Sequence, residues 1–125
     1  DRASRLAPKS TTDARAERAD MAATVHVDEA VLDYVSRLAE ATREDARTRL
    51  GVSVRGCLSL VRSAKVWAAS LGRSFVIPDD IKMLAHPVLN HRLLVTAEAQ
   101  FAGITVDQVI NQILGEVAPP TERVA

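Results

Sequence analysis

The feature that most constrains the fold is one long helix predicted for the middle of the chain. Residues 51–72 read GVSVRGCLSLVRSAKVWAASLG, in which Ser53 can cap the helix and Gly72 can end it. One apolar stripe recurs at helical spacing: Val54, Cys57, Leu58, Val61, Ala64, Ala68 and Leu71. Leu60 and Trp67 widen the apolar surface to a second face. A helix that is apolar on two faces is typical of the centre of a bundle.

Two more helices are predicted before this one. Residues 12–23 are rich in alanine and carry a thin apolar stripe, so a helix there would need a neighbour to hold it. A stronger pattern follows, with Asp28 as the candidate N-cap. Its apolar residues are Val27, Ala30, Val31, Tyr34, Val35 and Leu38. Residues 42–51 read as a charged connection.

The segment after the long helix begins with a short extended stretch at residues 75–76. Pro78 suits the first turn of a helix, and Asp79 and Asp80 complement the helix dipole there. We expect Pro87 to break or kink this helix.

Residues 93–104 show no helical periodicity and are expected to be irregular or extended. Thr105 and Gln108 then form a capping box, T-x-x-Q, which opens a last helix. The apolar side of that helix comprises Val106, Val109, Ile110, Ile113, Leu114 and Val117.

Length and composition agree with one small helical domain. The chain has 125 residues, 47% of them hydrophobic but only 3% aromatic, which suits close-packed helices better than a β-sandwich. We predict an all-α fold, a small bundle of four to five helices within residues 11–118. Residues 1–10 are expected to be a linker and residues 119–125 a flexible tail, because both offer little apolar surface.

Charge and cysteine content exclude several classes of function. Sixteen basic residues balance sixteen acidic ones, whereas a domain that binds nucleic acid usually carries a basic surplus. Cys57 is the single cysteine, so an internal disulfide is excluded and a reducing, cytoplasmic location is expected. The sequence contains no apolar run long enough to span a bilayer and no signal peptide.

The sequence shows no catalytic machinery. It has no phosphate loop of the form G-x-x-x-x-G-K-[ST], and His26, His86 and His91 lack metal-ligand spacing with one another or with Cys57. We assign no metal, and we expect Cys57 to act as a small buried hydrophobe. No enzymatic activity is expected of this chain by itself.

Arg55 is the one residue that the helical pattern does not explain. A cation in the first turn of a helix is disfavoured by about 0.3–1 kcal/mol, because that end of the helix dipole is positive. In one interpretation Arg55 lies on the surface with its stem over apolar neighbours. In the other it recognises an anion, since free N–H groups and a guanidinium together suit a phosphate.

Several motifs in order resemble the C-terminal lid of AAA+ ATPases of the MoxR family. That lid typically carries R-L-G-A-S-P-R-A, then G-R-x-x-V-x-P-x-D-[VI], then V-L-x-H-R-L, and this chain has their counterparts at 49–56, 72–81 and 88–93. Residues 25–30 and 41–44 also fit. The resemblance as a whole runs from about Leu6 to Val117. Val54 replaces a usual proline and Gly56 a usual alanine, which predicts a looser first turn.

The resemblance implies a role for Arg55. The matching arginine of the family is the sensor 2 residue, which senses the terminal phosphate of ATP. The implied parent binds ATP and Mg²⁺ through an AAA+ core, assembles as a homo-oligomeric ring such as a hexamer, and acts as a chaperone-like remodeller. Proteins with von Willebrand factor A domains are implied partners.

A different class of function is an autonomous helical module that binds a protein or DNA and has no nucleotide role. A helix-turn-helix protein needs an exposed, basic recognition helix. The long helix predicted here is apolar on two faces, which counts against DNA.

Overall fold

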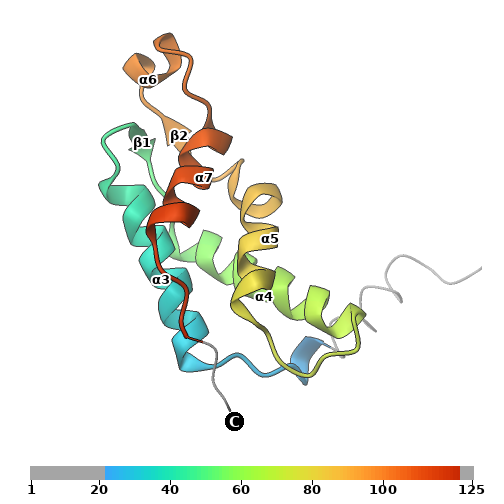
Figure 1. Ribbon diagram of the computed structural model, residues 1–125. Helices are drawn as coiled ribbons and strands as arrows, with labels where there is room; N and C mark the ends of the chain where they lie inside the picture. The colour runs from blue at the N-terminus through green and yellow to red at the C-terminus, as the bar shows by residue number, and fades with distance from the viewer. Residues whose placement is uncertain (1–21, 122–125) are drawn as a thin grey trace, which may run out of the picture.

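Five helices and a two-stranded sheet make up the part of the chain that the structure describes, residues 22–121 of a computed structural model (Figure 1). The all-α prediction of four to five helices is therefore confirmed. The elements are α3 (Glu29–Glu44), β1 (Thr48–Leu50), α4 (Val54–Ser70), α5 (Pro78–Leu89), β2 (Leu94–Val95), α6 (Ala97–Phe101) and α7 (Val106–Glu116). The predicted linker, most of the helix at 12–23 and the end of the tail lie outside the described residues.

Helix α4 packs mainly against α5 and also contacts α3, while α7 contacts both α3 and α5 (Figure 1). The buried residues of α4 recur every four positions: Gly56, Leu60, Ala64 and Ala68. Such a ridge of mostly small side chains lets a neighbouring helix approach closely. The predicted stripe was therefore wrong in part, because three of its large members are exposed: Val54 (69%), Leu58 (58%) and Leu71 (55%).

We predicted that Pro87 would break or kink helix α5, and the break does not occur, since the helix continues through Pro87 to Leu89. Proline removes the hydrogen bond to the carbonyl four residues earlier, which belongs to Met83, and its ring crowds that carbonyl. Both residues lie on the exposed side of α5, and the side chain of Met83 is 58% exposed. The lost bond thus lies on the exposed side of α5, and the helix continues through it to Leu89.

The segment from residue 93 to residue 104 is more regular than expected. Leu94 and Val95 form β2, which pairs with β1 in antiparallel fashion, and α6 follows at once. The Thr96 side chain caps α6 by accepting a hydrogen bond from the Ala99 amide at 3.0 Å. Figure 1 shows α6 at the end of the molecule remote from residues 22–25.

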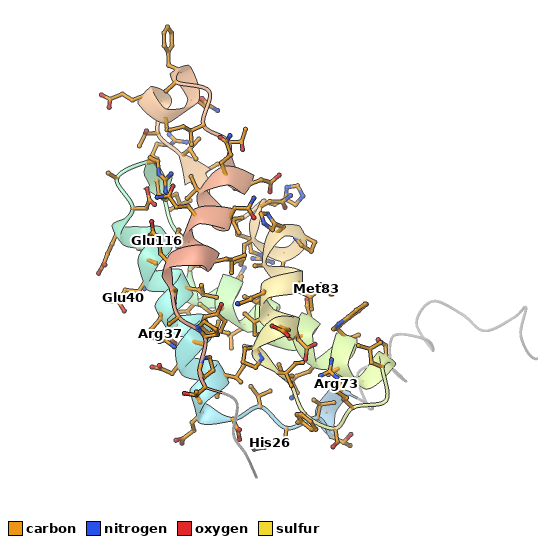
Figure 2. All side chains as sticks on the ribbon, in the orientation of Figure 1. His26, Arg37, Glu40, Arg73, Met83 and Glu116 are labelled. Carbon is orange, nitrogen blue, oxygen red and sulfur yellow. The ribbon has the colours of Figure 1, made fainter. Side chains whose placement is uncertain are left out.

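The predicted capping box at the start of α7 is confirmed. The Gln108 amide donates to the Thr105 hydroxyl at 3.2 Å, and the Gln108 side chain accepts from the Thr105 amide at 2.9 Å. Beyond α7, the Arg37 guanidinium donates to the Ala118 carbonyl at 2.9 Å. Figure 2 shows Arg37 on α3 beside the segment that follows α7. Both ends of α7 are thus fixed.

One apolar core joins α3, α4, α5 and α7. Its largest fully buried side chains include Tyr34 from α3, Leu60 from α4, Ile81 from α5 and Val109 from α7. Among the described residues, no helix combines the length and the hydropathy that a bilayer span requires.

Candidate functional site

Arg55 is the second residue of α4, and its side chain is exposed. Within residues 22–121 it forms no hydrogen bond and no ion pair. Other arginines of the same region do find carboxylates, for example Arg37 with Asp33 and Arg73 with Asp80. The guanidinium of Arg55 is therefore available to a group from outside the described residues.

The first turn of α4 is arranged as the sequence predicts. Ser53 caps the helix, and its hydroxyl accepts a hydrogen bond from the Gly56 amide at 3.3 Å. The amides of Val54 and Arg55 donate to no oxygen within the described range. No acidic residue lies in this turn. Free N–H groups, a positive helix end and an unpaired guanidinium together form a surface that attracts anions.

The chain that enters α4 is attached to α3 through Val52. The Val52 amide donates to the Thr42 hydroxyl at 2.9 Å, and the Val52 carbonyl accepts from Arg43 Nε at 2.9 Å. Residues 41–44 fit the family pattern, but the contact of Thr42 and Arg43 with Val52 was not predicted from the sequence, because this contact forms only when the two segments meet in the fold.

The packing beneath the first turn of α4 explains one residue that departs from the family pattern, Gly56. Gly56 is buried, and a Cβ there would lie 2.7 Å from Val52 Cγ1 and 3.4 Å from Arg92 Cδ. Val52, at 1% exposure, thus fills the space that an alanine methyl at position 56 would need. The first turn is therefore closely packed at Gly56, whereas Val54 and Arg55 of the same turn are exposed.

Cys57 lies half-buried on the same turn. Burial raises the pKa of its thiol, and the nearby positive charge of Arg43 opposes that rise. A raised pKa leaves less thiolate at neutral pH, which does not suit a nucleophile. The structure places Cys57 as a packing residue with a cation close by.

The three histidines do not come together in one site. His26 Nε2 lies 2.8 Å from Asp28 Oδ1, and Asp28 holds the N-cap position of α3 without a side-chain capping bond. His86 joins α5 to α7, with Nδ1 3.1 Å from Asp107 and Nε2 2.7 Å from Asn111. Across residues 22–121, no group of three His, Cys, Asp or Glu side chains could hold a metal ion.

Comparison with known proteins identifies the domain. Residues 40–113, more than half of the chain, match the family described as the AAA lid domain. The chain belongs to this family. Two curated relatives carry the MoxR name: chaperone MoxR1 of Mycobacterium tuberculosis, 34% identical over 110 residues, and protein MoxR of Paracoccus denitrificans, 34% identical over 84 residues. The domain is a MoxR-type AAA+ lid, and the resemblance read from its motifs is confirmed.

Two further relatives define the extent of the similarity. The uncharacterised protein YeaC of Bacillus subtilis is 36% identical over 101 residues, which is 81% of this chain. A crystal structure of a Cytophaga hutchinsonii protein assigned as an ATPase matches 82% of the chain with a TM-score of 0.76 and 32% identity. The two MoxR proteins match over 81% and 57% of the chain. The lid spans 32%, 29% and 25% of the lengths of the three curated relatives and 34% of the solved chain.

Proposed function

We propose that this lid senses the nucleotide state of a larger MoxR-type AAA+ ATPase, and that Arg55 is the sensor 2 residue that contacts the terminal phosphate of ATP. The observation that carries the proposal is the position of Arg55. It is exposed on the first turn of α4, beside amides that have no acceptor within residues 22–121, and no carboxylate of that range neutralises it. A phosphate would satisfy the guanidinium and the free amides together.

The core of the parent protein would supply the groups that the lid lacks. These are the phosphate loop, the acid that holds Mg²⁺ and the arginine finger, all of which the MoxR resemblance implies. The lengths of the relatives support this division, since the lid spans about a third or less of each. The lid would associate with that core in a homo-oligomeric ring, such as a hexamer, in the cytoplasm. A chaperone-like activity is proposed from the name of chaperone MoxR1, and partners with von Willebrand factor A domains from the family resemblance.

Lid movement would couple the nucleotide to the ring. ATP binds both the core and Arg55, whereas ADP lacks the group that Arg55 contacts. The ligands therefore favour different lid positions, and each shifts the population by its differential affinity.

The test is Arg55→Ala in the full-length ATPase. One charge-assisted interaction is removed, of about 1.5–3 kcal/mol, so ATP affinity, turnover or both should fall by roughly ten- to a hundred-fold. The affinity for ADP should change much less. Binding of both nucleotides is measured by titration calorimetry and turnover by phosphate release.

The matched control is Arg62→Ala on the same helix. Arg62 is also exposed and has no ion pair within the described part of the chain, but it lies about two turns from the start of α4. The Arg62→Ala variant should leave the affinities for ATP and ADP unchanged. Unchanged ATP affinity and turnover in Arg55→Ala would reject the proposed function.

A further inference from the structure

We propose that Arg43 and Thr42 on α3 are positioning residues for Arg55, and that they act by holding Val52 where the chain turns into α4. The inference rests on the proposed function of Arg55 and extends it to a helix that contributes no group to the phosphate contact. The proposal explains which contacts fix the orientation of Arg55.

Both polar backbone groups of Val52 are bound by adjacent residues of α3. Val52 is 1% exposed, so its N–H and C=O need partners within the protein. Thr42 Oγ1 accepts from the Val52 amide at 2.9 Å and donates to the Ala39 carbonyl at 2.6 Å. Arg43 Nε donates to the Val52 carbonyl at 2.9 Å. Val52 can therefore shift relative to α3 only by losing these hydrogen bonds, of which the one to Thr42 is buried.

The residue before Val52 brings the backbone itself against α3. A Cβ at Gly51 would lie 2.6 Å from Arg43 Cγ and 2.7 Å from Arg43 Cα, distances that no side chain tolerates. Because Gly51 has no side chain, its backbone can pack directly against Arg43. Only Ser53 and Val54 separate Val52 from Arg55, and Ser53 is itself fixed as the helix cap. The direction of Arg55 follows from the position of Val52.

A second observation places the charge of Arg43 at the start of α4. That charge opposes the rise in the pKa of the Cys57 thiol that burial causes. Cys57 is the fourth residue of α4. Within residues 22–121, Arg43 forms no ion pair, and its side chain donates one hydrogen bond, to the Val52 carbonyl. The guanidinium therefore serves the turn into α4.

The experiment compares ATP and ADP affinity in the full-length ATPase. Arg43→Ala should weaken ATP binding by about two- to thirty-fold and leave ADP binding nearly unchanged, because only the γ-phosphate contact depends on Arg55. Arg43→Gln should keep ATP affinity, since the glutamine Nε2 can occupy the place of the arginine Nε and donate to Val52. Thr42→Val should behave as Arg43→Ala does, and Thr42→Ser, which keeps the hydroxyl, should not. Arg49→Ala, at an exposed arginine of β1, is the matched control.

A double-mutant cycle decides whether Arg43 acts through Arg55. In an Arg55→Ala background, Arg43→Ala should cost no further ATP affinity, because the residue that it positions is gone. A further loss in that background would show that Arg43 contacts the nucleotide or the core directly, and would overturn the inference. So would unchanged ATP affinity in both Arg43→Ala and Thr42→Val while Arg55→Ala is impaired. If Arg55→Ala is itself unimpaired, the proposed function fails and the inference falls with it.

The Cys57 thiol gives a readout that needs no nucleotide. Both Arg43→Ala and Arg43→Gln remove the charge, so both should raise the pKa of Cys57 and slow its alkylation by iodoacetamide at pH 8. Only Arg43→Ala should also weaken ATP binding. Loss of ATP affinity in Arg43→Gln equal to that in Arg43→Ala would mean that the charge, not the hydrogen bond to Val52, is what matters, and would overturn the inference.

Discussion

Arg73 holds the buried carboxylate of Asp80 with both of its terminal nitrogens, at 2.8 Å and 2.6 Å. The Asp80 side chain is 3% exposed and also accepts from the Ile77 amide at 2.9 Å, so it caps α5 where no serine or threonine is present. The same segment binds the N-terminal end of the domain, since the His26 amide donates to the Ser74 carbonyl and the Val76 amide donates to His26. The arginine and aspartate of G-R-x-x-V-x-P-x-D are thus a structural pair. Figure 2 shows Arg73 and His26 in the same region.

Removing Arg73 should destabilise the domain strongly. Arg73→Ala leaves the Asp80 carboxylate buried without its cation, which costs about 3–5 kcal/mol for a fully buried pair. We expect the lower end of that range, because Arg73 is 25% exposed. Urea unfolding of the chain measures the loss. Arg62→Ala, on the exposed face of α4, should change the free energy of unfolding by less than about 0.5 kcal/mol, and equal losses in the two variants would contradict the assignment.

Gly56 and Val52 should show strong coupling. In the natural chain, Gly56→Ala places a methyl 2.7 Å from Val52 Cγ1, and such overpacking costs about 1–3 kcal/mol. With Val52→Ala in place, the methyl has room, and the gain in helix propensity of about 1 kcal/mol should appear instead. The effect of Gly56→Ala on the free energy of unfolding is therefore expected to be destabilising in the natural chain and stabilising beside Val52→Ala. If the effects of the two single substitutions simply add in the double variant, the two side chains do not share this space.

The features that sequence predicted well are those set by neighbouring residues. The Ser53 cap and the capping box of Thr105 and Gln108 each depend on side chains three positions apart, and both are present. The buried face of α4 depends on which helix covers it. Small residues there bring α5 close, so Leu58 is exposed although its spacing predicted burial.

The missed features depend on tertiary contacts or on very short segments. Helix α6 has five residues, too few for a periodic pattern, and it is stabilised by its Thr96 cap. Within the candidate site, Arg55 was predicted from its motif, and the structure adds that it is exposed and unpaired within residues 22–121. The attachment of Val52 to α3 was not predictable, because Thr42 and Val52 come together only when the chain folds.

Asp45 should contribute stability that is lost in acid. Its carboxylate accepts from Arg47 Nε at 2.9 Å, from Nη2 at 2.6 Å and from the Arg47 amide at 2.8 Å, and these contacts lower its pKa. A group whose pKa is lowered by folding stabilises the protein above its unfolded pKa of about 3.9, and that stability disappears as the pH falls through the folded value. Asp45→Asn should therefore cost about 1–2 kcal/mol at pH 7, and this cost should shrink as the pH falls below about 3.9. A loss that does not shrink in acid, measured by urea unfolding, would show that the charge of Asp45 is not responsible.

Tyr34 should tolerate the loss of its hydroxyl. The side chain is fully buried in the core, and its oxygen has no hydrogen-bond partner within the described part of the chain. Burial raises the pKa of the phenol, as expected for a hydroxyl that has lost its water. The Arg37 guanidinium lies 5.6 Å from the centre of the ring, a contact that phenylalanine retains. Tyr34→Phe should accordingly leave stability unchanged or raise it by up to about 1 kcal/mol, since a buried hydroxyl without a partner is costly.

The matched comparison is Tyr34→Ala, which removes the ring as well. Deleting a buried aromatic side chain costs about 3–5 kcal/mol, so the ring and the hydroxyl are tested separately by urea unfolding. A loss of more than about 1 kcal/mol in Tyr34→Phe would mean that the hydroxyl has a partner such as a buried water molecule. A gain in Tyr34→Phe together with a large loss in Tyr34→Ala is the expected pattern, because α3 is held to the core by the apolar area of the ring and not by its oxygen.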